Sequence, residues 1–85
     1  MAREMLPYAE VLAKVQNLLL GCEDCRNISV DALLVGETAD GGANWLIASF
    51  RCSGDDNDLR ACKDRILGDV RTLRECYDVD PDSPR

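Results

Sequence analysis

The sequence predicts an α+β protein in the order helix, strand, strand, helix (αββα), with both helices on one face of an antiparallel β-hairpin. Apolar residues recur at three- and four-residue spacing over residues 7–22 and 59–77, which is typical of amphipathic helices. Between these segments, residues 28–36 and 44–52 are rich in β-branched and aromatic side chains and flank an Asp-Gly-Gly turn. The length of 85 residues fits one domain. We predict that this domain spans residues 1–79 and that residues 80–85 form a disordered acidic tail.

The first helix is predicted to begin at Pro7, because the missing N–H of proline costs nothing in the first turn of a helix. Its apolar stripe comprises Tyr8, Val11, Leu12, Val15, Leu18 and Leu19. Gly21 is expected to end this helix in the left-handed conformation.

The two predicted strands are apolar on both faces near the turn. One face carries Ile28, Val30, Ala32 and Leu34 beside Leu46, Ala48, Phe50 and Cys52. The other face is polar at Ser29, Asp31, Ser49 and Arg51 but apolar at Leu33, Val35, Trp45 and Ile47. A sheet that is covered on one side alternates cleanly between apolar and polar residues. We therefore predict that Leu33, Val35, Trp45 and Ile47 form an interaction face. A second copy of the chain would cover this face in a homodimer. The two hairpins would join into a four-stranded sheet or pack back to back.

The apolar pattern also constrains the loop between the strands. A two-residue Asp-Gly turn would pair Leu34 with Ile47 and would mix the two faces. A loop with an odd number of residues restores the match, so we expect a bulged or longer loop. The same register can place Asp31 opposite Arg51 as a cross-strand ion pair.

The second helix is predicted to begin after residues 53–56, where Asp55 or Asp56 can cap its first turn. Asp58 adds negative charge near the helix start, which suits the helix dipole. The apolar stripe of this helix comprises Leu59, Cys62, Ile66, Val70, Leu73 and Tyr77.

Charge and composition narrow the classes of function. The net charge is −6 and the basic residues are scattered, so we predict neither a nucleic-acid partner nor a membrane surface. The chain has no His, the commonest general base and metal ligand, and no set of residues specifies a reaction. We predict a protein that is not an enzyme and has no cofactor. The residues before Cys22 resemble a lipoprotein cleavage site, but Glu10 and Lys14 interrupt the apolar segment, so the predicted location is cytoplasmic.

Five cysteines are the next unusual feature: Cys22, Cys25, Cys52, Cys62 and Cys76. Their odd number and the lack of an export signal argue against a disulfide framework, and we expect Cys52, Cys62 and Cys76 to be small buried apolar residues. Cys22 and Cys25 form a CxxC motif that follows a helix, whereas reactive CxxC motifs begin one, which disfavours redox chemistry. The alternative function is a structural zinc site of Cys22 and Cys25 with Cys52 and either Cys62 or Cys76, although the usual second ligand pair is missing. A small-ligand pocket between the hairpin and the helices is a third alternative.

Two short motifs resemble a group of small uncharacterised bacterial proteins. Residues 40–45 read Asp-Gly-Gly-Ala-Asn-Trp and residues 75–79 read Glu-Cys-Tyr-Asp-Val. The similar proteins share a Gly-x-Asn-Trp element after a hairpin turn and a helix that closes on an aromatic and a polar residue. The resemblance spans residues 28–79, with Ala43 where these proteins more often have Cys. It implies a bacterial cytoplasmic setting and no catalytic residue, and it suggests that the Asn44 side chain bonds the backbone of its own loop.

The function predicted from the sequence is therefore a non-catalytic interaction or regulatory module. It would act as a homodimer, or bind another protein, through Leu33, Val35, Trp45 and Ile47.

Overall fold

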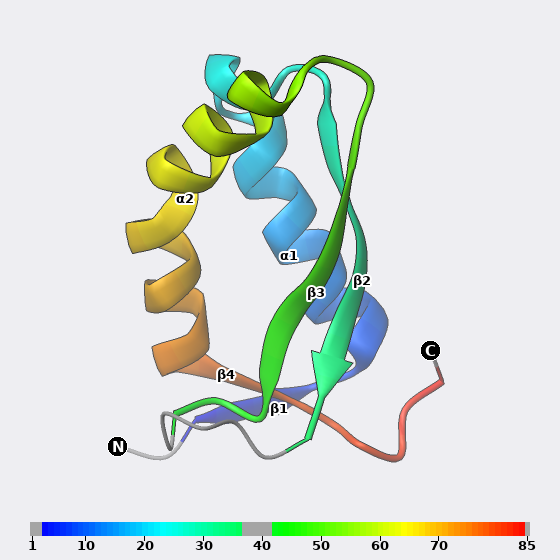
Figure 1. Cartoon of the computed structure of the whole chain (residues 1–85). Coiled ribbons are helices and arrows are strands. Elements are labelled where there is room, and N and C mark those ends of the chain that lie inside the picture. Colours follow the sequence, from blue (N-terminus) through cyan, green and yellow to red (C-terminus); the bar gives the residue numbers. More distant parts are fainter. Residues whose placement is uncertain (1–2, 37–41, 85) are drawn as a thin grey trace.

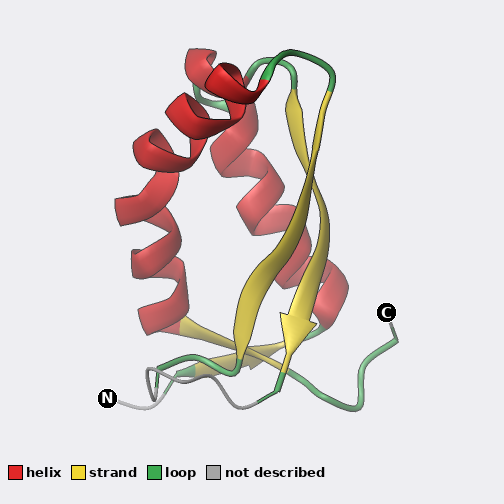
Figure 2. Ribbon diagram, viewed as in Figure 1, coloured by secondary structure: helices red, strands yellow, loops and turns green. Residues whose placement is uncertain are grey.

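The computed structural model describes residues 3–36 and 42–84 and shows a small α+β protein (Figures 1 and 2). The elements are β1 (Glu4–Leu6), α1 (Tyr8–Leu20), the 3₁₀ turn η1 (Glu23–Cys25), β2 (Ile28–Val35), β3 (Trp45–Cys52), α2 (Asp56–Cys76) and β4 (Tyr77–Val79). The strands β2 and β3 form an antiparallel hairpin, and β1 and β4 form a separate parallel pair. Figure 1 shows the two helices side by side next to the hairpin, with the β1–β4 pair crossing at one end.

The sequence-based prediction of both long helices is confirmed. Four residues of the predicted stripe of α1 are buried (Tyr8, Val11, Val15 and Leu19), and Leu12 and Leu18 are half-buried. Asp55 caps α2 by accepting a hydrogen bond from the Asp58 N–H at 3.1 Å. Two details differ from the prediction. Gly21 ends α1 with φ −83°, which is the right-handed region, and Tyr77 leaves the helix to begin β4.

The prediction that the strands have two continuous faces is wrong, because both strands carry a β-bulge. The pairing skips Asp31 on β2 and Ala48 on β3, and the register is the same before and after the two bulges. One extra residue turns every following side chain to the opposite face. The buried side chains of β2 are accordingly Ile28 and Val30 before the bulge and Leu33 after it.

The bulges remove the apolar face that was predicted to need a cover. Trp45 is 0% exposed and Leu33 is 6% exposed within a single chain, and Val35 and Ile47 are half-buried and pack against the same core. Leu34, assigned from the sequence to the inner face, is instead 62% exposed. The homodimer was predicted because the indole of Trp45 was expected to be exposed. The burial of Trp45 within one chain removes this reason for a homodimer.

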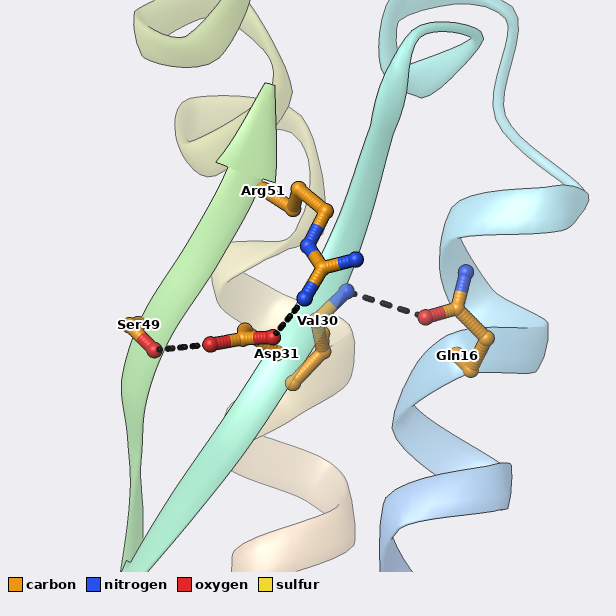
Figure 3. Close-up of polar contacts among 5 residues, drawn as sticks. All are labelled: Gln16, Val30, Asp31, Ser49 and Arg51. Carbon is orange, nitrogen blue, oxygen red and sulfur yellow. Dashed lines mark hydrogen bonds and ion pairs between the residues drawn. The ribbon is translucent and has the colours of Figure 1, made fainter. Parts of the chain in front are cut away.

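The register of the hairpin confirms one smaller prediction: Leu34 pairs with Leu46, as an odd-numbered loop requires, although the turn residues 37–41 lie outside the described part of the chain. The predicted ion pair also forms, but Arg51 lies opposite Ser29 and not opposite Asp31, which is in the bulge. Arg51 donates to Asp31 at 2.8 Å (Figure 3), and both side chains are largely exposed, so the pair contributes little to stability.

The outer edge of β2 is closed by side chains of α1. The main-chain N–H of Val30 donates to Gln16 Oε1 at 2.9 Å (Figure 3), and the N–H of Leu33 donates to the Tyr8 hydroxyl at 2.8 Å. An unpaired strand edge is a site for unwanted pairing with another chain. Helix α1 therefore both covers the hairpin and protects this edge.

The C-terminal segment is ordered where the sequence predicted a disordered tail. β4 pairs with β1 from Tyr77 to Val79, and the Asp80 N–H then donates to the Leu6 carbonyl at 2.7 Å. The Ser83 hydroxyl accepts a hydrogen bond from the Tyr8 N–H at 2.9 Å, at the start of α1. Residues 80–84 thus form a bonded turn, and the folded unit extends past residue 79.

Asn44 joins β4 to the hairpin. Its side-chain Nδ2 donates to the Val79 carbonyl and its Oδ1 accepts from the Val79 N–H, both at 2.8 Å. The indole Nε1–H of Trp45 donates to the Tyr77 carbonyl at 3.0 Å. The resemblance suggested that Asn44 bonds its own loop; instead its amide pairs with β4 as a neighbouring strand would. The two motifs of that resemblance therefore contact each other, because Asn44 and Trp45 of the first bind the main chain of Tyr77 and Val79 in the second.

We expect Asn44→Ala to lower the free energy of unfolding by about 2 kcal/mol or more, because two main-chain groups of the fully buried Val79 lose their partners. Chemical denaturation followed by Trp45 fluorescence measures this, and the Val79 amide should also lose protection from hydrogen exchange. Asn57→Ala, at an exposed position in the first turn of α2, is the matched control and should stay within about 0.5 kcal/mol. Equal effects of the two substitutions would contradict the role assigned to Asn44.

Candidate functional site

A shallow apolar groove of about 300 Å³ runs between β3 and α2. Its walls are Leu46, Ile47 and Phe50 from β3 and Lys63, Ile66, Leu67, Val70 and Arg74 from α2. On α2 these residues recur at three- and four-residue spacing, so they form one stripe along the helix. From residue 63 to residue 74 the stripe is about 16 Å long, at 1.5 Å per residue.

Large apolar side chains remain exposed on both sides of this groove. Leu67 on α2 is 59% exposed and Leu46 on β3 is 39% exposed. Leu34, the cross-strand neighbour of Leu46, continues the apolar surface onto the outer side of the hairpin. We call the surface formed by Leu34, Leu46, Phe50, Leu67 and Val70 the apolar band. An exposed apolar surface of this kind marks an interaction site more often than scattered single residues do.

The groove is flanked by positive charge, although the whole chain is acidic. Lys63 holds its ammonium over the Phe50 ring, 5.3 Å from the ring centre. Arg60 and Arg71 are exposed and lie seven residues before and four residues after Leu67, on the same side of α2. β3 carries no acidic residue. On this side of α2 the three basic residues Arg60, Lys63 and Arg71 outnumber the two acids Asp56 and Asp64, so the flank of the groove is more basic than the chain as a whole, whose net charge is −6.

Arg74 closes the end of the groove near the chain termini. Its Nε donates to the Trp45 carbonyl at 2.9 Å, and its own carbonyl accepts from Arg3 Nε at 2.7 Å. A second guanidinium nitrogen donates to the Ala43 carbonyl at 3.3 Å. These bonds fix the distance between α2 and the start of β3, so this end of the groove is preformed.

A larger hollow of about 790 Å³ lies where α1 ends beside α2. Its charged lining is mixed in sign and exposed: Glu23, Asp24, Arg65 and Asp69. Arg65 and Asp24 approach each other to 3.5 Å, and both are more than half exposed. Solvated charges of both signs recognise little by themselves, so we favour the smaller apolar groove as the candidate site.

The structure separates the four residues that the sequence assigned to an interaction face. Trp45 and Leu33 belong to the core, Val35 is half-buried against it, and Ile47 is the one of the four that lines the groove. Leu46 and Leu67 were not predicted from the sequence to be surface residues. Leu67 could have been found, because it lies off the apolar stripe predicted for the second helix.

The prediction against disulfides is wrong for one pair of cysteines. Cys25 and Cys62 form a disulfide that joins η1 to α2, with 37 residues of sequence separation. Cys22, Cys52 and Cys76 carry free thiols. Cys52 is partly exposed and Cys76 is exposed, so the prediction that they are buried is wrong, whereas Cys62 is buried. The zinc alternative is not supported either: over residues 3–36 and 42–84 no group of three or more His, Cys, Asp or Glu side chains could hold a metal ion. Cys25 and Cys62 are bonded to each other, which removes two of the four suggested ligands.

Within the described residues, no helix is both long enough and apolar enough to cross a lipid bilayer. The prediction of a cytoplasmic location stays a prediction. Comparison of the chain with protein-family models, with curated proteins and with solved structures finds no match.

Proposed function

We propose that this protein is a non-catalytic interaction module that binds an acidic amphipathic segment of another protein in the groove between β3 and α2. The observation that carries the proposal is the combination of an apolar groove with a cationic flank. Apolar side chains of the segment would lie against the apolar band, and its carboxylates would lie near Arg60, Lys63 and Arg71. At about 16 Å, the groove suits a segment of about eleven helical or five extended residues.

Charge also separates this partner from a second copy of the chain. In a two-fold dimer centred on the groove, each basic flank would lie near the same flank of the other copy. Like charges held at an interface disfavour that arrangement. The homodimer with a four-stranded sheet, predicted from the sequence, thus becomes the competing outcome of the test below.

The test uses two synthetic amphipathic peptides with the same apolar residues, one flanked by Glu and the other by Lys. In fluorescence anisotropy titrations we expect the Glu peptide to bind about tenfold more tightly or better, and this preference should shrink at high salt. Leu67→Asp should weaken binding of the Glu peptide by at least about tenfold, because it places a carboxylate inside the groove.

The matched control is Leu20→Asp, an exposed helical leucine on α1 that lies outside the groove. It should leave peptide binding unchanged. Equal binding of both peptides, or equal effects of the two leucine variants, would refute the proposal. Sedimentation analysis of the free protein completes the test: a dimer that Leu67→Asp dissociates would assign the groove to a second copy instead.

A further inference from the structure

Three cysteines lie together where α1, η1 and α2 meet. The disulfide sulfurs belong to Cys25, which is 2% exposed, and Cys62, which is 0% exposed. Cys22 carries a free thiol, is partly exposed and packs against the same core. A dissolved thiol can therefore reach Cys22 but is shielded from both sulfurs of the disulfide.

Cys22 immediately precedes the 3₁₀ turn that ends at Cys25, and its own backbone is extended. The Cys25 N–H donates to the Cys22 carbonyl at 3.1 Å, so the turn holds the two residues close together. Both residues also line one recess of about 350 Å³, together with Leu20, Arg26 and Ile28. Cys22 is thus the thiol placed to attack the disulfide from within the protein.

We propose that Cys22 is a thiol–disulfide exchange site, through which low-molecular-weight thiols reduce the buried Cys25–Cys62 bond. In the first step the Cys22 thiolate attacks the Cys25 sulfur. A Cys22–Cys25 bond forms, the Cys25–Cys62 bond breaks, and Cys62 leaves as a thiolate that takes up a proton. No electron enters or leaves the protein in this step.

The second step moves the disulfide to the surface. The thiolate of an external thiol RSH attacks the Cys22 sulfur, which forms a mixed disulfide on Cys22 and releases Cys25 as a thiolate. A second RS⁻ attacks the external sulfur of this mixed disulfide, so RSSR forms and the Cys22 thiolate is restored. In sum, two RSH become RSSR and the protein disulfide becomes two thiols.

The odd number of cysteines favours a bond that is made and broken. One disulfide stands beside three free thiols, whereas a framework disulfide protein pairs its cysteines. Breaking the bond would release α2 from η1 while leaving the hydrogen bonds of Asn44 and Arg74 at the other end of the molecule intact. Reduction would thus loosen one end of α2 selectively.

The experiment measures how fast reduced glutathione reduces the Cys25–Cys62 bond in the folded, full-length protein. Samples are quenched with an alkylating reagent, and the alkylated peptides are identified by mass spectrometry. We expect Cys22→Ser to slow reduction by about tenfold or more, and we expect Cys52→Ser and Cys76→Ser to leave the rate unchanged. Cys62→Ala, on oxidation, should form a Cys22–Cys25 disulfide.

Low concentrations of urea separate this route from reduction of an unfolded chain. Exchange through Cys22 should be insensitive to urea, whereas reduction that requires unfolding accelerates with it. The proposal is overturned if Cys22→Ser is reduced as fast as the wild type at equal stability, if the wild-type rate follows global unfolding, or if oxidised Cys62→Ala contains no Cys22–Cys25 bond.

Discussion

A Trp45→Ala variant should lose about 3–5 kcal/mol of unfolding free energy, the usual cost of removing a fully buried large aromatic side chain. A domain of this size has a total of only about 4–13 kcal/mol, so the variant should be largely or partly unfolded at 37 °C. The loss has two sources. The substitution leaves a cavity among the core residues, and the Tyr77 carbonyl loses the indole N–H that it accepts at 3.0 Å.

Trp45→Phe separates these two sources, because it keeps much of the apolar volume and removes the indole N–H. Its expected cost is intermediate, about 2 kcal/mol. Unfolding has to be followed by far-UV circular dichroism, since Trp45 is the single tryptophan. Leu34→Ala, on the exposed side of β2, is the control and should change stability by no more than about 0.5 kcal/mol.

The same variants decide between the core position of Trp45 and the interaction face predicted from the sequence. If Trp45 sat on a dimer interface, Trp45→Ala would leave the monomer stable and would weaken self-association. If Trp45 is a core residue, the variant loses secondary structure at every protein concentration. A folded, monomeric Trp45→Ala protein with near wild-type stability would contradict the structure.

The failure of the face assignment has a local cause. Strict alternation is a sound guide along an unbroken strand, and it placed both strands of the hairpin and the parity of the loop correctly. The three- and four-residue spacing placed both long helices. Two compensating bulges, at Asp31 and Ala48, exchange the inner and outer faces halfway along the hairpin. The register is the same on both sides of the bulges, so the pairing expected from the sequence does not reveal them. Each strand therefore looks, in the sequence, like a continuous strand with apolar residues on both faces.

The short parallel pair could not be predicted for a different reason. β1 and β4 have three residues each, too few to show a period, and they lie at opposite ends of the chain. Tyr77 also continues the helical spacing of α2, so the pattern extends the helix past its real end. What stops the helix is tertiary: Asn44 and Trp45 bind the main chain of β4 and favour the extended form.

The candidate groove is likewise a property of the assembled fold. Neither Leu46 nor Leu67 is distinctive within its own segment of the sequence. They line one groove because the fold places α2 beside β3. The distance between these elements is held by Arg74, whose bonds to Trp45 and Ala43 join residues about thirty positions apart. Helical and strand periods report which side of an element is apolar, but they do not report which elements become neighbours.

The Cys25–Cys62 disulfide gives the second large prediction. Its 37-residue separation restricts the unfolded chain, and the loop-entropy relation predicts a stabilisation of about 3–4 kcal/mol. The double variant Cys25→Ala/Cys62→Ala should lose most of this amount in urea denaturation followed by Trp45 fluorescence. Wild-type protein that is fully reduced with dithiothreitol should lose a similar amount.

Cys76→Ser is the control for the disulfide, because its thiol is free and exposed and its replacement should be nearly neutral. An oxidised wild type that is no more stable than the double variant would contradict the prediction that the disulfide stabilises the fold by restricting the unfolded chain. A stabilising disulfide would also give the exchange at Cys22 a physical consequence. The bond contributes about 3–4 kcal/mol to a total free energy of unfolding of about 4–13 kcal/mol. The fraction of folded protein therefore depends on the thiol–disulfide redox potential of its surroundings.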